Sequence, residues 1–163
     1  EYFDVELNSF SGRKEMINAL NAVMVEGIRI VDVKELDEKE GNAMASVAAA
    51  DYLVSFRNNV TLPDDWKEKL TAFYDREHII VTKKTKKSEK EIDLKEGIYA
   101  LEIRGNQIYL LLDAGSGSNL KPGFVLETFL ESIGVSVPEF AFGVYRLETY
   151  KRSKKGKLLP LIS

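Results

Sequence analysis

Between Ile98 and Leu112 the chain reads I-Y-A-L-E-I-R-G-N-Q-I-Y-L-L-L. This stretch contains two apolar runs, 98–103 and 108–112, on either side of the polar segment 104–107. Short runs rich in β-branched and aromatic residues, separated by a few residues that include glycine, are typical of a β-hairpin. We therefore predict two neighbouring antiparallel strands here, and the flanking segments extend the pattern in both directions.

The segments on either side of the hairpin alternate between strands and helices. A helix is predicted from Pro63, because proline tolerates the first turn and carboxylates behind it suit the positive end of the helix dipole. Trp66, Leu70, Phe73 and Tyr74 form its apolar stripe. A second helix is predicted from Pro122, with Val125, Leu126, Phe129, Leu130 and Ile133 on its core face. Strands are predicted at 52–57, 79–82 and 142–150, with Ile92 and Leu94 in a further short strand.

These elements follow the order β-α-β-β-α-β, which predicts an α+β fold of the ferredoxin-like split βαβ type for residues 42–163. Residues 1–41 show only β-α-β, with strands at 2–7 and 28–33 around a helix that begins near Ser11. We interpret this part as the remainder of a second, similar lobe whose beginning lies upstream. The alanine-rich segment 42–50 is the expected boundary, either as a short helix or as a tightly packed connector.

The composition excludes several kinds of site. The 163 residues include no cysteine and a single histidine, His78, and they carry a formal net charge of −3. Without cysteine the chain has no thiolate zinc site, no cysteine-ligated iron–sulfur cluster and no disulfide. Its longest apolar run, 108–112, is far shorter than the roughly 20 residues that a membrane span needs. We expect a cytoplasmic protein without a membrane contact, a metal or a cofactor.

Basic residues gather in two short segments. Lys83, Lys84, Lys86, Lys87 and Lys90 form the first basic segment, and Lys151, Arg152, Lys154, Lys155 and Lys157 form the second basic segment. Each follows or ends a predicted strand, so the two segments would merge into one cationic patch if those strands were neighbours. Such a patch suits a phosphate backbone. The alternative is two solvated loops that keep strand edges from aggregating.

A small-residue loop, A-G-S-G-S-N-L-K-P, connects a strand to a helix at 114–122. Backbone amides in such a loop can turn toward an anion at a helix N-terminus. The candidate anion-binding residues are Gly115, Ser116, Gly117, Asn119 and Lys121. The alternative is a tight turn in which Ser118 or Asn119 caps the helix. The loop lacks the Gly-Lys-Ser/Thr ending of a Walker A motif.

Arg146, Glu148 and Tyr150 alternate along the closing strand, so they are predicted to share one face. Arginine meets phosphate and tyrosine stacks on bases, which makes Arg146 and Tyr150 candidate RNA contacts. Cross-strand pairing on a solvated sheet is the alternative. His78 is expected to be a solvated or capping residue, and no Gly-x-Ser-x-Gly elbow accompanies it. We predict no catalytic residue.

Four segments resemble a known family when they are taken in order. They are E-Y-F-D-V-E-L (1–7), M-A-S-V-A-A-A-D-Y (44–52), K-K-T-K-K-S-E-K-E-I-D-L-K (83–95) and the loop 114–122. Together they are similar to a bacterial radical-SAM-associated domain of unknown function, found alone or joined behind a cobalamin-type radical-SAM module. Members of that family carry an upstream segment with Ser-His-Leu-Asp and Gly-Phe-x-Pro-x-Pro-Lys motifs, which this chain lacks.

The resemblance implies an accessory role beside radical-SAM chemistry, in an RNA-related setting. The leading hypothesis is a non-catalytic module that binds RNA or another polyanion for a separate radical-SAM partner. One alternative is a protein-interaction domain that docks on the radical-SAM enzyme. Another is an enzyme whose site needs the upstream segment. Half a lobe with exposed strand edges would also permit a homodimer.

Overall fold

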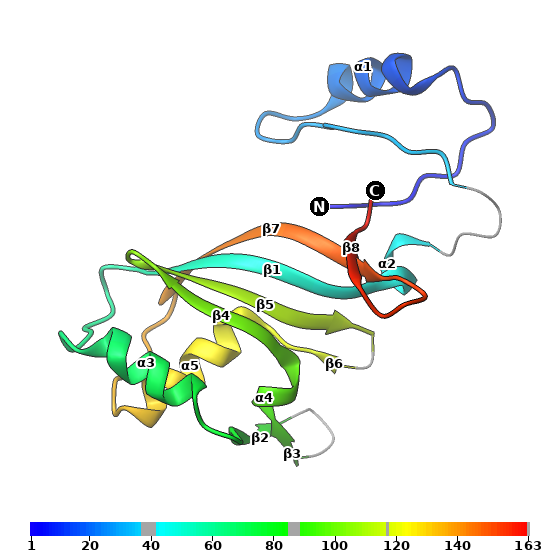
Figure 1. The fold of residues 1–163 in the computed structure, drawn as a ribbon. Helices are drawn as coiled ribbons and strands as arrows, with labels where there is room; N and C mark the ends of the chain where they lie inside the picture. Colours follow the sequence, from blue (N-terminus) through cyan, green and yellow to red (C-terminus); the bar gives the residue numbers. More distant parts are fainter. Residues whose placement is uncertain (37–41, 85–88, 117, 163) are drawn as a thin grey trace.

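The computed structural model describes residues 1–36, 42–116 and 118–162, except 85–88, and it describes the backbone alone at 83 and 84. A six-stranded sheet forms its centre, with strand order β4-β5-β1-β7-β8 and with β6 paired to β5 (Figure 1). These strands are β1 (Val47–Phe56), β4 (Ile98–Arg104), β5 (Gln107–Gly115), β6 (Ser118–Asn119), β7 (Phe142–Arg152) and β8 (Leu158–Pro160). A separate two-stranded sheet pairs β2 (Ile80–Lys84) with β3 (Glu89–Asp93).

The residues that the structure describes form five helices, which are α1 (Arg13–Val23), α2 (Ala43–Ser46), α3 (Trp66–Tyr74), α4 (Leu94–Gly97) and α5 (Pro122–Ser132). β5 is antiparallel to both of its neighbours, β1 and β4, so β1 and β4 run parallel with one strand between them. That is the arrangement of a split βαβ unit, with α3 in the crossover. The predicted α+β class is confirmed, whereas the ferredoxin-like assignment stays a prediction that this strand order supports.

The hairpin predicted at 98–112 is confirmed as β4 and β5. Their register pairs Arg104 with Gln107 across a tight turn. Gly105 lies in this turn with φ at 64°, a left-handed conformation that costs glycine little and other residues more. The turn residue therefore allows the two apolar runs to pair, with one shift in register between Ile98 and Ala100.

One face of the sheet carries the hydrophobic core, and both α3 and α5 cover it (Figure 1). Tyr52 and Val54 of β1 and Leu110 of β5 lie in this core with the buried residues of the helices. The rings of Phe73 in α3 and Phe129 in α5 meet edge to face, with centroids 5.6 Å apart. The predicted apolar stripes of both helices are thus buried against the same face. The other face is called helix-free, because α1, which lies on that side, has no buried residue in the described part of the chain (Figure 1).

The N-terminal part, residues 1–36, departs from the prediction. Its helix is confirmed as α1, but neither 2–7 nor 28–33 forms a strand. The side-chain amide of Asn21 binds both backbone groups of Ile30, accepting from its N–H at 2.8 Å and donating to its carbonyl at 2.9 Å. A side chain in α1 thereby takes the place of a neighbouring strand at that residue. The division into parts 1–41 and 42–163 stays a prediction.

Two smaller boundaries also differ. The 42–50 segment resolves into the one-turn helix α2, where the side chain of Asn42 accepts from the Ala45 N–H at 2.7 Å, and into the beginning of β1. The strand begins at Val47 rather than at residue 52, because alanines can lie between two neighbouring strands in the middle of the sheet. Leu94 begins α4 and does not extend β3, since the Asp93 side chain caps the Lys95 N–H. No helix in the ranges that the structure describes has the length and apolar character of a membrane span.

Candidate functional site

A hollow of about 650 Å³ lies where β1 begins and β5 ends. Its walls come from α2, the beginning of β1, β4, the end of β5 with the following loop, and β7. The polar and aromatic residues on these walls are Ser46, Tyr99, Asp113, Ser116, Ser118, Lys151 and Arg152. The hollow therefore joins part of the small-residue loop to part of the second basic segment, which lie more than thirty residues apart in the sequence.

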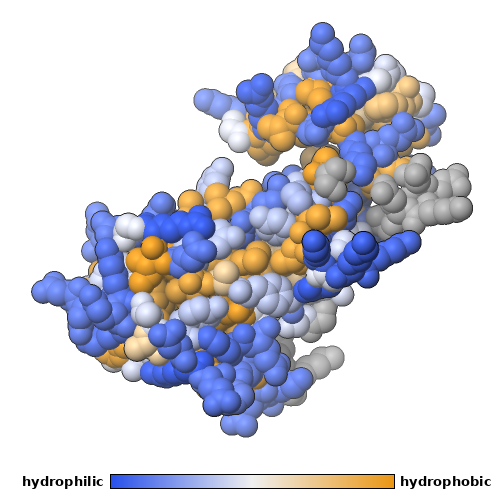
Figure 2. Space-filling view, in the orientation of Figure 1, coloured by the Kyte–Doolittle hydropathy of each residue, from blue (hydrophilic) through white to orange (hydrophobic). Residues whose placement is uncertain are grey.

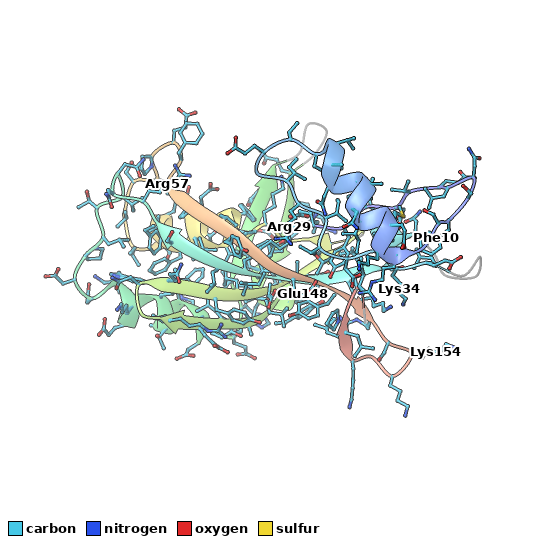
Figure 3. All side chains as sticks on the ribbon, turned by 90° about the horizontal axis from the view of Figure 1, so that it is seen from above. Phe10, Arg29, Lys34, Arg57, Glu148 and Lys154 are labelled. Carbon is cyan, nitrogen blue, oxygen red and sulfur yellow. The ribbon has the colours of Figure 1, made fainter. Side chains whose placement is uncertain are left out.

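Lys151 and Arg152 end β7, immediately before the turn that connects β7 to β8. Arg152 donates from Nη1 to the Gly156 carbonyl at 3.1 Å and from Nη2 to the Tyr99 hydroxyl at 3.3 Å, with its guanidinium 5.7 Å from the Tyr99 ring. Within the described ranges, none of the five basic residues of the second basic segment has a carboxylate partner. Hydrophilic side chains gather around this hairpin in Figure 2, and Figure 3 shows Lys154 at its outer end. The hairpin is a concentrated positive charge beside the hollow.

The small-residue loop does not present Gly115 as an anion-binding amide. The Gly115 N–H donates to Oδ1 of Asp113 at 2.9 Å, so this donor is already occupied. Asn119 pairs with Ala114 in the short ladder between β5 and β6. Of the loop's remaining candidates, Ser116 lines the hollow, and Gly117 lies outside the described residues.

The helix cap after this loop also differs from the alternative prediction. Lys121 occupies the N-cap position of α5, with Pro122 in the first turn, and no side chain caps the helix. Neither Ser118 nor Asn119 is therefore the cap. The loop forms part of the wall of the hollow and supplies the hydroxyls of Ser116 and Ser118. The positive charge on the wall comes from Lys151 and Arg152 of β7.

The first basic segment lies elsewhere. Lys83 and Lys84 end β2 and Lys90 lies in β3, whereas Lys86 and Lys87 fall outside the described residues. The condition for one merged patch, that the strands leading into the two basic segments are neighbours, is not met, because β2 pairs with β3 in its own sheet while β7 pairs with β1 and β8. A single merged patch therefore does not follow from strand pairing.

Asp93 closes the base of the β2–β3 hairpin. Its Oδ1 accepts from the Ile79 N–H at 2.9 Å and the Lys95 N–H at 3.0 Å, and its Oδ2 lies 2.7 Å from Nδ1 of His78. The Ile79 hydrogen bond, followed by the one to His78, lowers the pKa of Asp93 below its usual value. The chain's single histidine is well exposed and serves this anchor, with its side chain 65% accessible.

Arg146 and Tyr150 do not share a face. The pairing of β1 with β7 shifts between Asp51 and Tyr52, so Arg146 pairs with Tyr52 while Glu148 pairs with Asp51. Asp51 and Tyr52 are neighbours in β1, so their side chains point to opposite faces of the sheet. Their partners in β7, Glu148 and Arg146, therefore also lie on opposite faces, because the pairing is irregular at this point. The guanidinium of Arg146 lies 5.5 Å from the Tyr52 ring and also forms an ion pair with Glu1 at 2.6 Å. The prediction that Arg146 shares a face with Glu148 and Tyr150 is wrong, whereas their contact with RNA stays a prediction.

On the helix-free face, Tyr150 is bound by Asp51, a residue that the sequence did not single out. Asp51 is only 5% exposed; Oδ2 accepts from the hydroxyls of Tyr150 at 3.0 Å and Tyr109 at 3.1 Å, and Oδ1 accepts from the Glu148 N–H at 2.8 Å. Burial and then the hydrogen bond to Asp51 raise the pKa of Tyr150 to about 12. Tyr99 was missed as well, because its position beside Arg152 depends on the curvature of the sheet.

Comparison with other proteins yields a single family. A search of curated proteins gives no match, and a search of solved structures gives none. The model of the family described as "Uncharacterized protein conserved in bacteria (DUF2344)" matches residues 1–122 of the 163 in the chain. This range includes the small-residue loop and the first basic segment, and it ends before β7. Since the match covers well over half of the sequence, the chain belongs to the DUF2344 family of bacterial proteins.

Proposed function

We propose that the domain binds RNA at the hollow beside the β7–β8 hairpin, as a non-catalytic module. The observation that carries this proposal is the placement of Lys151 and Arg152 on the wall of the hollow, next to the turn of a hairpin whose basic residues have no carboxylate partner in the described ranges. Unpaired lysines release counterions when they meet phosphates, and this release drives binding to nucleic acid.

Three kinds of group on the hollow suit a single-stranded ligand. The ring of Tyr99 offers a stacking surface for a base, and the adjacent Arg152 supports stacking and phosphate contact. The hydroxyls of Ser116 and Ser118 can donate to phosphate or ribose oxygens. Asp113 is the acidic residue of the lining, and its Oδ1 is already bound to the Gly115 N–H. The phosphates would therefore lie toward β7, away from Asp113.

The resemblance to the radical-SAM-associated domain extends the proposal. In that setting the module would hold RNA for a separate radical-SAM partner, since a chain without cysteine has no ligands for the radical-SAM cluster. The domain would then bind and position the RNA, and the partner would catalyse the reaction.

The experiment is a fluorescence-anisotropy titration of labelled single-stranded RNA at about 50 and 200 mM salt. With four or five phosphate contacts, the log–log dependence of affinity on salt should have a slope of roughly −3, at about 0.7 per contact on single strands. Changing Lys154 and Lys155 to glutamine should weaken binding and reduce that slope by about 1.4, which is two contacts' worth. The control changes two lysines elsewhere, Lys14→Gln at an exposed position and Lys67→Gln at a half-buried one.

A third variant, Lys83→Gln with Lys84→Gln, tests the first basic segment. Under the proposal it weakens binding less than the Lys154 and Lys155 changes do. The proposal fails if the unchanged chain does not bind RNA at low salt, or if the control pair weakens binding as much as the hairpin pair. A larger loss from the Lys83 and Lys84 changes would move the interface to the β2–β3 hairpin.

A further inference from the structure

The outer edge of β7 is open along its first half. β7 pairs with β1 on one side from Phe142 to Lys151, but on the other side β8 pairs only with Tyr150, Lys151 and Arg152. No other strand in the described part of the chain lies beyond it (Figure 1). The Arg57 side chain donates to the Phe142 carbonyl at 3.2 Å, and contacts from Glu1 and Tyr2 reach Arg146 and Glu148. The open stretch therefore lies between the contacts at Phe142 and Arg146, at residues 143–145.

The two edges of the sheet are protected differently. At the opposite edge, β4 carries the ion pair of Glu102 with Arg104 at 2.7 Å, and charges of this kind discourage pairing with another chain. Residues 142–145 of β7 carry no charge. Val144 is 49% exposed and Tyr145 is 68% exposed, one on each face of the strand. An uncharged, apolar edge is a template for an added strand.

A second hollow, of about 550 Å³, adjoins this edge on the helix side of the sheet. Its lining combines the apolar residues Val137, Phe140 and Val144 with the carboxylates of Glu127, Glu131 and Glu139. Phe140 is 71% exposed. None of the three glutamates has an ion-pair partner among the described residues. Unpaired acids around an apolar floor favour a ligand that brings positive charge on an apolar stem.

We propose that the outer edge of β7 binds an extended segment of a partner protein in which basic residues alternate with apolar ones. An added strand places alternate side chains on opposite faces of the sheet. Basic side chains on the helix side meet Glu127, Glu131 and Glu139. Apolar side chains on the other side lie beside Tyr145 and Leu147. Backbone hydrogen bonds supply affinity in this mode of binding, and the side chains supply specificity.

The test uses a capped, labelled hexapeptide of alternating lysine and valine as the probe for fluorescence anisotropy. Hydrogen exchange of the complex should show protection at residues 143–145 and no change along β4. Val144→Lys should weaken binding roughly tenfold or more, because it adds a repelling charge to the edge. Val31→Lys, at an exposed position in the N-terminal part, is the matched control. Changing Glu127, Glu131 and Glu139 together to glutamine should weaken binding of the same peptide.

Two further probes separate edge pairing from simple charge attraction. A version with alternate backbone nitrogens methylated keeps the lysines but cannot pair, and a glutamate–valine version reverses the charge; neither should bind. The proposal is overturned if the lysine–valine peptide does not bind, if the methylated peptide binds equally well, or if protection appears elsewhere. It is also overturned if the free chain sediments as a dimer that Val144→Lys dissociates, because the occupant is then a second copy. The RNA proposal depends on other residues and is unaffected by these results.

Discussion

The hydroxyl of Tyr150 in β7 donates to Oδ2 of Asp51 in β1 at 3.0 Å, on the helix-free face of the sheet. Tyr109 of β5 donates to the same oxygen, so Asp51 is bound from both neighbouring strands. The third donor, the Glu148 N–H, lies where the pairing of β1 with β7 shifts. Asp51 thus accepts a backbone hydrogen bond at the point where the ladder between β1 and β7 is interrupted, and where Arg146 and Glu148 come to lie on opposite faces.

Asp51→Ala should lower the free energy of unfolding by about 3 kcal/mol, because three donors lose a buried acceptor and each such loss costs about 1–3 kcal/mol before relaxation. Asp51→Asn should cost less, since its oxygen still accepts from Glu148 and the phenols can accept from its amide. Urea unfolding measures both values. Asp64→Ala is the control on an exposed carboxylate. Equal losses for Asp51→Ala and Asp64→Ala would contradict the structural role of Asp51.

The pKa values of Tyr2, Tyr109 and Tyr150 are all raised, which predicts a loss of stability at high pH. Burial followed by a hydrogen bond to a carboxylate raises the pKa of both Tyr2 and Tyr150 to about 12. In the unfolded chain these phenols ionise near pH 10, so their contribution is complete below about pH 10 and is lost as the pH rises toward 12. Tyrosinate absorbance should keep rising above pH 10 as these phenols ionise, and Tyr150→Phe should reduce the size of that late rise. An unchanged late absorbance in that variant would count against the Asp51 contact.

Asp93 predicts the opposite dependence at low pH. Because its pKa is lowered in the folded chain, its contribution is present above the ordinary carboxyl value and is lost as the pH falls from about 4 through the folded pKa. Asp93→Ala should therefore flatten the acid limb of the stability curve. It should also speed hydrogen exchange at the Ile79 and Lys95 amides, which Asp93 binds. If exchange at both amides is unchanged, Asp93 does not anchor the β2–β3 hairpin.

Phe129→Ala should lower the free energy of unfolding by about 3–5 kcal/mol, because it leaves a cavity beside Phe73 in the middle of the core. Phe140→Ala removes the same side chain at an exposed position and should change stability by less than about 0.5 kcal/mol. Chemical unfolding of the two variants side by side compares them. Similar losses would mean that α5 does not pack on the sheet as described.

Local patterns were sufficient to predict the elements whose signals lie within a few residues. The hairpin at 98–112 and the helices α1, α3 and α5 were confirmed because apolar periodicity and turn residues act over short distances along the chain. The small-residue loop and the second basic segment were also predicted as candidate binding segments. The sequence did not predict that both would line the same hollow.

Everything that depends on which strands pair was decided by the tertiary structure. Residues 28–33 have the composition of a strand, but Asn21 binds the backbone of Ile30 and no neighbouring strand is present in the described ranges. β2 pairs with β3, which separates the two basic segments. The shift beside Asp51 moves Arg146 to the face opposite Tyr150, because a slip of one residue reverses the direction of every following side chain. Composition and periodicity carry no information about such pairings, since the partners come from distant parts of the chain.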